Sequence, residues 1–173
     1  RNIEQYIIEN AFDKGYVKPN IPNKRSGKKV AVIGSGPAGL AAAGYLVKNH
    51  FGVTIFEAQN EPGGMLLFGI PEYRLPGAIV RREIETLQQC GVEIRLQKRA
   101  GIDFTIDDLF AEGYDAIFMA VGTALPKTLD IPGKELSSIL TASYFLRTDA
   151  LANVGKLDKS EIVLHSGDRV VVV

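Results

Sequence analysis

The chain has 173 residues, of which 46% are hydrophobic, and its 20 Lys and Arg balance 20 Asp and Glu, so the formal net charge is zero. This size and composition suit one globular domain with a substantial core. The balanced charge predicts neither a nucleic acid nor a membrane as partner, because both attract a basic excess. The single cysteine, Cys90, excludes an intrachain disulfide and an all-cysteine iron–sulfur site within these residues, and it agrees with a cytoplasmic location.

The pattern of apolar residues predicts a short helix and then an alternating α/β domain. Helical spacing marks residues 3–12, and prolines and glycines mark 16–28 as a linker. From residue 29, strands and helices alternate, which is typical of a parallel sheet covered on both faces. The expected strands are 30–33, 53–57, 92–96, 114–121 and 169–173; the expected helices are 37–48, 77–90, 106–111 with Thr105 as N-cap, and 142–152; 58–76 is a loop.

A glycine fingerprint, Gly34-Ser35-Gly36-Pro37-Ala38-Gly39, joins the first strand to the next helix. In such a turn Gly34 permits the sharp bend, Gly36 lets a pyrophosphate approach the backbone, and Gly39 lets helix and strand pack closely. Glu57 ends the second strand about 20 residues on, where a carboxylate accepts hydrogen bonds from ribose hydroxyls. A 2′-phosphate would be repelled there, so the sequence predicts a dinucleotide other than NADP at this site.

The fingerprint by itself leaves NAD and FAD both open. A second glycine pair, Gly63-Gly64, follows Glu57 after a short interval. Such a pair lets another backbone segment approach the cofactor, and FAD is long enough to need contacts beyond its pyrophosphate. The pair therefore favours FAD.

Longer runs resemble the small (beta) subunit of NADPH-dependent glutamate synthase. They also resemble the FAD domains of dihydropyrimidine dehydrogenase and of related ferredoxin–NADP oxidoreductase subunits. The first segment, with Ile3-Glu4-Gln5-Tyr6 and Lys18-Pro19, is similar to the tail of the iron–sulfur domain in this family. The other matching runs are 30–40, Glu57 through Gly63-Gly64, Gly69-Ile70-Pro71-Glu72-Tyr73-Arg74-Leu75-Pro76, Gly122-Thr123 and Ile131-Pro132-Gly133.

The resemblance implies a domain plan and a set of cofactor-binding residues. Among its side chains the sequence offers no candidate catalytic acid or base and no metal ligand. Residues 1–28 would be the helical tail of an iron–sulfur domain plus a linker, 29–168 an incomplete Rossmann-like FAD domain, and 169–173 the first strand of a truncated NAD(P)H domain. The implied cofactor-binding residues are Gly34, Ser35, Gly36, Pro37, Ala38 and Gly39 at the pyrophosphate, Glu57 and Ala58 at the adenosine ribose, Gly64, Met65 and Leu66 on the flavin side, Arg74 near the phosphates or ribityl chain, Ala100 at the adenine, and Gly122 at the next strand end.

The activity implied is electron transfer from NADPH through FAD to iron–sulfur clusters. The acceptor would be the large (alpha) glutamate synthase subunit or another electron-acceptor protein, and NADPH and the [4Fe–4S] clusters would be held elsewhere in the full-length protein. We expect residues 1–173 to be a fragment that is inactive alone. Two alternatives stay open: a pyrimidine-reducing or ferredoxin–NADP oxidoreductase relative, and a non-catalytic module that docks a partner subunit.

Overall fold

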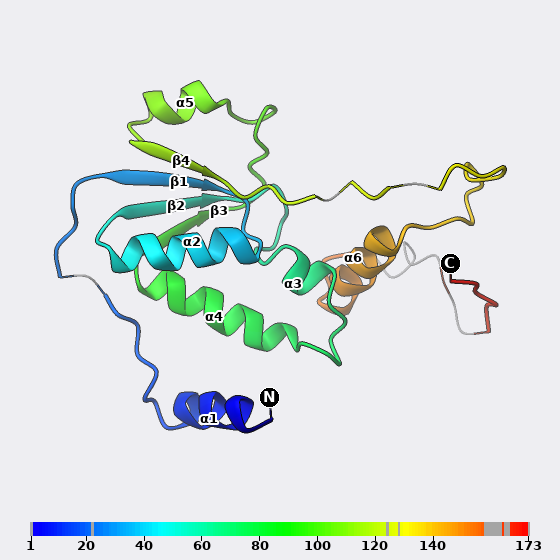
Figure 1. Ribbon diagram of the computed structural model, residues 1–173, viewed down its shortest axis with the longest axis horizontal. Helices are drawn as coiled ribbons and strands as arrows, with labels where there is room; N and C mark the ends of the chain where they lie inside the picture. Colours follow the sequence, from blue (N-terminus) through cyan, green and yellow to red (C-terminus); the bar gives the residue numbers. More distant parts are fainter. Residues whose placement is uncertain are drawn as a thin grey trace.

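A parallel four-stranded sheet forms the centre of the fold (Figure 1). The computed structural model describes residues 2–21, 23–123, 125–127, 129–157, 164 and 167–172. The strand order is β3-β2-β1-β4, and every neighbouring pair runs parallel, so the predicted α/β fold is confirmed. The strands are β1 (Lys29–Ile33), β2 (Gly52–Phe56), β3 (Val92–Arg95) and β4 (Ala116–Met119).

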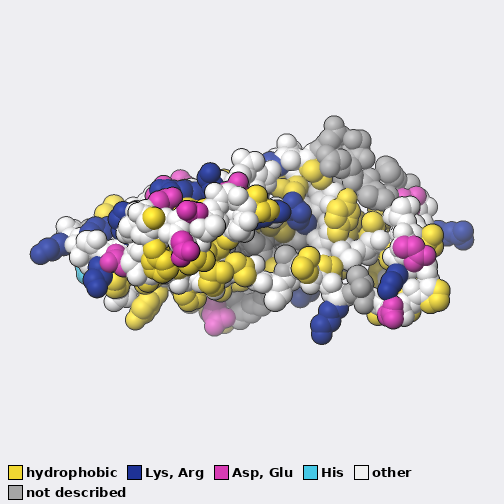
Figure 2. Space-filling model, turned by 90° about the horizontal axis from the view of Figure 1, so that it is seen from above, with side chains coloured by type: hydrophobic (Ala, Val, Ile, Leu, Met, Phe, Trp, Pro, Cys, Tyr) yellow, Lys and Arg dark blue, Asp and Glu magenta, His cyan; other side chains and the backbone are white. Residues whose placement is uncertain are grey.

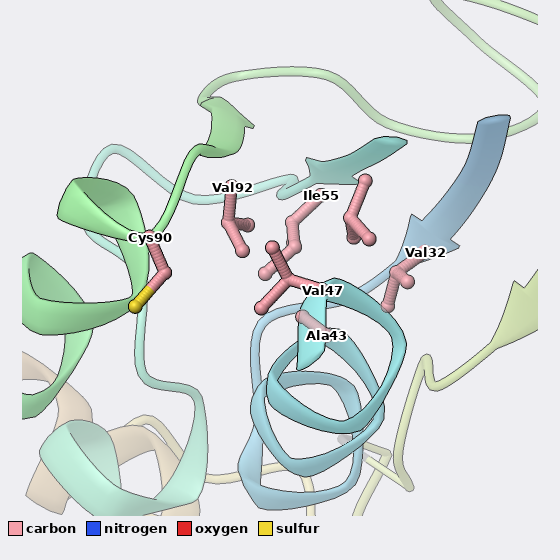
Figure 3. Packing of buried hydrophobic residues seen from close by; sticks show 7 residues of the cluster. Val32, Ala43, Val47, Ile55, Cys90 and Val92 are labelled. Atoms are coloured by element: carbon pink, nitrogen blue, oxygen red, sulfur yellow. The ribbon is translucent and has the colours of Figure 1, made fainter. Parts of the chain in front are cut away.

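Alternating side chains of β1 build two separate hydrophobic clusters, because successive residues of a strand point to opposite faces. Val32 packs with Val47 of α2 (Pro37–Lys48) on one face. Ala31 and Ile33 belong to the cluster on the opposite face. Figure 3 shows the first cluster, in which side chains from the strands, from α2 and from the C-terminal end of α4 (Gly77–Gln89) converge. Each large apolar side chain buried there contributes about 1.5–3 kcal/mol.

Helices cover the two faces of the sheet. α2 and α4 (Gly77–Gln89) lie against one face, and α5 (Ile106–Ala111) lies on the other side (Figure 1). Leu109 anchors α5, since its side chain is fully buried. Thr105 caps α5 as predicted: its hydroxyl accepts from the Asp108 amide at 3.2 Å, and the Asp108 carboxylate accepts from the Thr105 amide at 2.7 Å. This reciprocal capping box satisfies amides that the helix itself leaves free.

The edge strand β4 is less covered than the sequence predicts. Of the expected strand 114–121, only Ala116–Met119 pairs with the sheet. Phe118 and Met119 remain 43% and 55% exposed. Among the described residues, β4 is an edge strand with a strand neighbour on one side only. Figure 2, a view from above, shows hydrophobic side chains at the surface of the half of the molecule that contains the sheet.

The first helix, α1 (Asn2–Asp13), contacts α4. Arg82 of α4 donates two hydrogen bonds to the Glu9 carboxylate, at 2.8 and 3.0 Å. Its guanidinium also lies 3.7 Å from the centre of the Phe12 ring, a cation–π arrangement. The expected helix over 3–12 is thus confirmed. In the parts of the chain that the structure describes, no helix is both long and apolar enough to cross a membrane.

Two further segments differ from the sequence prediction. The expected loop 58–76 contains a one-turn helix, α3 (Met65–Phe68), which packs against α6 (Ala142–Asn153). The described part of the expected strand 169–173, residues 169–172, forms no strand. A strand needs a neighbour to satisfy its backbone groups, and none pairs with 169–172 among the described residues. The assignment of 169–173 to a second nucleotide domain, and the limits 1–28 and 29–168, stay predictions.

Candidate functional site

The candidate site lies where the parallel strands end at one edge of the sheet. In the register of the sheet, Ile33 of β1 stands level with Phe56 of β2 and Met119 of β4. The Gly34 amide donates to the Phe56 carbonyl at 2.8 Å, and the Ala120 amide donates to the Ile33 carbonyl at 2.8 Å. The three strand ends are therefore fixed side by side. Crevices at the carboxyl ends of such sheets are where α/β folds bind nucleotides.

Two glycines of the fingerprint are required by close packing. A Cβ on Gly39 would lie 1.9 Å from the Gly34 carbonyl oxygen, and a Cβ on Gly34 would lie 2.3 Å from the Ala120 carbonyl oxygen. Gly34 also has a positive φ of 104°, which side chains rarely adopt. These glycines allow β1, α2 and the end of β4 to approach one another.

Gly36 differs from both, because nothing lies within 4 Å of the place where its Cβ would be. Its φ of −68° suits any residue, so neither packing nor backbone strain requires glycine there. Gly36 is the N-cap of α2, Pro37 follows at the first helical position, and no side chain caps this end of the helix in the structure as described. The free amides and the positive end of the helix dipole make such a terminus suitable for an anion.

The Glu57 carboxylate lies beside this turn and is held by three protein donors. The Ser35 amide donates to Oε2 at 2.9 Å, and the Ser35 hydroxyl donates to the same oxygen. The Gln59 amide donates to Oε1 at 2.8 Å. Glu57 and Ser35 are both buried, with 7% and 0% of their surface exposed. Spacing in the sequence brings Glu57 to the edge of the sheet, but it does not reveal these donors.

The second glycine pair lies directly against the first turn. The Gly63 amide donates to the Ser35 hydroxyl oxygen at 3.0 Å. A Cβ on Gly64 would lie 2.7 Å from the Gly36 Cα, and its φ of 52° with ψ of −133° is a conformation that favours glycine. The two glycine segments, 28 residues apart, therefore form one backbone surface at the start of α2.

The other predicted site residues lie at varying positions around this surface. Ala58 is half-buried directly after Glu57, and the segment that leads to Ala100 runs beside it, since the Lys98 amide donates to the Glu57 carbonyl at 2.8 Å. Gly122 is exposed and follows the end of β4 with a φ of 67°. In α3, Met65 is 57% exposed, whereas Leu66 packs against the cluster between α3, α4 and α6.

Arg74 is not brought to the glycine turns by any bond that the structure describes. It lies on an exposed turn between α3 and α4. Its amide donates to the Pro71 carbonyl at 2.8 Å. Its side chain makes no hydrogen bond or ion pair with the described residues. Its contact with a cofactor stays a prediction.

Sequence reasoning missed Glu61, a buried carboxylate that holds three segments together near the site. Its Oε1 accepts from the Arg81 guanidinium of α4 at 2.6 Å, and its Oε2 pairs with the Lys156 ammonium just after α6. Glu61 is 5% exposed. Burial acts to raise the pKa of Glu61, but the hydrogen bonds from Lys156 and Arg81 outweigh it and lower the pKa below its usual value. An acidic residue just before a proline and two glycines gives no pattern that would have identified this role.

We expect Glu61→Gln to destabilise the fold by about 1–3 kcal/mol at neutral pH, less than for a fully buried pair because Arg81 and Lys156 can regain water. The lowered folded-state pKa means that this stabilisation is complete above the pKa of the unfolded carboxyl and is lost as the pH falls through the folded value. Urea unfolding at several pH values measures it. The gap between wild type and variant should close in acid, while Glu112→Gln, at an exposed ion pair, should cost less than about 1 kcal/mol. A gap that persists unchanged at pH 2 would contradict this role.

Comparison with known proteins identifies the kind of domain that carries this site. The family model described as pyridine nucleotide-disulphide oxidoreductase matches residues 28–173. The glutamate synthase [NADPH] small chain of Bacillus subtilis is 39% identical over 160 residues, which are 92% of this chain and 32% of that protein. The protein of the same name from Escherichia coli is 37% identical, over 99% of this chain and 37% of its own length. The chain thus spans about a third of these curated relatives.

Solved structures agree with the fold. FprA of Mycobacterium tuberculosis in complex with NADPH matches with a TM-score of 0.61 and 26% identity, over 69% of this chain and 28% of that chain. A 2-naphthoyl-CoA reductase complex matches with a TM-score of 0.60 and 25% identity, over 81% of this chain and 20% of that chain. The family model covers most of the chain and includes both glycine segments and Glu57. The chain therefore belongs to the pyridine nucleotide-disulphide oxidoreductase family.

Proposed function

We propose that this chain binds FAD at the carboxyl edge of its sheet and forms the FAD-binding part of an NADPH-dependent oxidoreductase of the glutamate synthase small-chain type. The observation that carries the proposal is the open side of Gly36. This glycine has free space where its Cβ would be, at an uncapped helix N-terminus beside a buried carboxylate. A pyrophosphate fits that arrangement, because it needs backbone amides without an intervening side chain.

We assign residues of this chain to FAD along the length of the cofactor. The turn Gly34–Gly39 and the first amides of α2 would hold the pyrophosphate, and Glu57 would accept a hydrogen bond from a ribose hydroxyl. The contact between Gly64 and Gly36 would place a second backbone segment along the same cofactor, with Met65 and Leu66 following. We also propose the cofactor contacts that the resemblance implies for four further residues: Ala58 at the ribose, Ala100 at the adenine, Gly122 at the strand end, and Arg74 near the phosphates or ribityl chain.

The chemistry would belong to the bound flavin, which accepts a hydride and releases single electrons. The protein would bind and orient it, and Glu57 would serve as a hydrogen-bond acceptor. Similarity to glutamate synthase small chains over most of this chain supports NADPH as the electron donor. By the same similarity, iron–sulfur clusters and a large subunit, or another electron-acceptor protein, would receive the electrons in the cytoplasm.

The test uses the purified protein as its gene encodes it. We expect a yellow protein with one non-covalently bound FAD, released by denaturation and identified by its absorbance and mass. Under anaerobic conditions NADPH should bleach the flavin absorbance band in a saturable manner, because the nicotinamide must bind before it reacts. A colourless protein that takes up no added FAD would contradict the proposal and favour a subunit-docking module. A flavoprotein that NADPH does not bleach would retain the FAD site and refute the choice of electron donor.

A further inference from the structure

The side chain of Ser35 lies at the junction of three segments that are distant in the sequence. Its hydroxyl donates to Glu57 at the end of β2 and accepts from the Gly63 amide in the second glycine pair. These partners are 22 and 28 residues away along the chain. Ser35 is fully buried. A cofactor that lies against the surface of the turn would therefore meet its backbone and not its hydroxyl.

The two hydrogen bonds of this hydroxyl fix each other's direction. A serine hydroxyl has one proton to donate and two lone pairs to accept with. The hydroxyl donates its hydrogen bond to the Glu57 carboxylate, because an ionised carboxylate can only accept. The Gly63 amide then occupies a lone pair. Neither bond can reverse, so the hydroxyl helps to orient Glu57 and to position Gly63 at the same time.

The same arrangement limits what Glu57 can still bind. An ionised carboxylate offers about four lone-pair sites. Three are taken by the Ser35 amide, the Ser35 hydroxyl and the Gln59 amide. One site on Oε1 therefore remains for an incoming donor, such as a single ribose hydroxyl. Groups that are already oriented lose less conformational freedom on binding, which strengthens binding.

We propose that Ser35 is a positioning residue for the dinucleotide: it acts through Glu57 and Gly63 and makes no side-chain contact with the cofactor. It orients the carboxylate that accepts from the ribose, and it holds the pair Gly63-Gly64 against Gly36. This inference rests on the FAD site proposed above and deepens it. It distinguishes Ser35 from Gly36, whose role is to leave space for the phosphates.

The experiment is a double-mutant cycle on FAD affinity, measured by quenching of flavin fluorescence. The variants are Ser35→Ala, Glu57→Gln and both together, with Ser138→Ala at an exposed serine as the matched control. Ser35→Ala should raise the Kd about tenfold, equivalent to about 1.4 kcal/mol, and Ser138→Ala should leave it unchanged. The Kd of the double variant should rise by less than the product of the two single fold-changes, since part of the effect of Ser35 is exerted through Glu57. Fold-changes that multiply, or an unchanged Kd for Ser35→Ala, would overturn the inference.

Hydrogen exchange of the Gly63 amide provides a second measurement that does not depend on flavin. In the protein freed of FAD, Ser35→Ala should speed this exchange at least about tenfold, while the amide of Val32 in the core should stay protected as in the wild type. Glu57→Ala, which keeps the hydroxyl but removes its acceptor, should also speed exchange at Gly63. An unchanged rate in both variants refutes the junction. A wild type that never binds FAD refutes the proposed site and this inference together, whereas a wild type that binds and an unaffected Ser35→Ala refute the inference alone.

Discussion

Gly36→Leu should abolish FAD binding while the protein stays folded. A side chain on Gly36 would project into open space, which is the space that the phosphates need. Loss of two charge-assisted hydrogen bonds, at about 1.5–3 kcal/mol each, would weaken binding at least about a hundredfold. The measurement is flavin content after purification, followed by titration of the flavin-free protein with FAD.

The fold should tolerate this change because Gly36 has an ordinary backbone conformation. Leucine is a poorer N-cap than glycine, and we expect that difference to cost about 1 kcal/mol of the free energy of unfolding. Gly36→Ala, with its smaller side chain, should lose less affinity than Gly36→Leu. Full flavin content in Gly36→Leu would place the pyrophosphate somewhere other than at α2.

Gly39→Ala, unlike Gly36→Leu, should destabilise the fold itself. Its Cβ would meet the Gly34 carbonyl oxygen at 1.9 Å and the Gly34 carbonyl carbon at 3.0 Å. Both atoms belong to the backbone, so the turn and α2 must move apart. Overpacking of this kind costs about 1–3 kcal/mol or more. Urea unfolding followed by circular dichroism should show that the free energy of unfolding falls by about 3 kcal/mol. Thermal unfolding should show a Tm lower by about 6–12 °C.

Gly44→Ala is the matched control in the same helix. Its Cβ would lie 3.3 Å from the Leu87 Cδ2 atom, the end of a flexible side chain that can shift. Replacing a mid-helix glycine with alanine stabilises by about 0.5–1 kcal/mol, so this variant should be as stable as the wild type or slightly more. Equal stability of Gly39→Ala and Gly44→Ala would show that α2 and the turn are not packed as described.

The sequence by itself determined the elements whose causes are local. β1 follows from a run of apolar residues, and α5 from the cap Thr105 with Asp108 one turn later. The fingerprint also predicted that Gly34, Gly36 and Gly39 would lie at a strand-to-helix turn, because the spacing of its glycines reflects the geometry of that turn. Its position relative to Glu57 followed from the parallel order of the strands.

Local patterns could not predict how exposed the elements are. The apolar run 114–121 gives the same pattern for a central strand and an edge strand. Only the structure shows that β4 lies at the edge of the described sheet and that Phe118 and Met119 are exposed. Likewise, residues 169–172 have strand propensity, but propensity forms no strand where no other strand pairs with it.

What only the tertiary structure decided is how the site is held. The hydrogen bonds that join Ser35 to Glu57 and Gly63, and the contact of Gly64 with Gly36, connect residues that are 22 and 28 positions apart. The ion pairs of Glu61 with Arg81 and Lys156 likewise join a loop to segments near α4 and α6. The sequence determines which of these groups can donate and which can accept. Which of them meet depends on how the chain closes over such distances, because a hydrogen bond needs its two atoms within about 3 Å and spacing along the chain does not specify that.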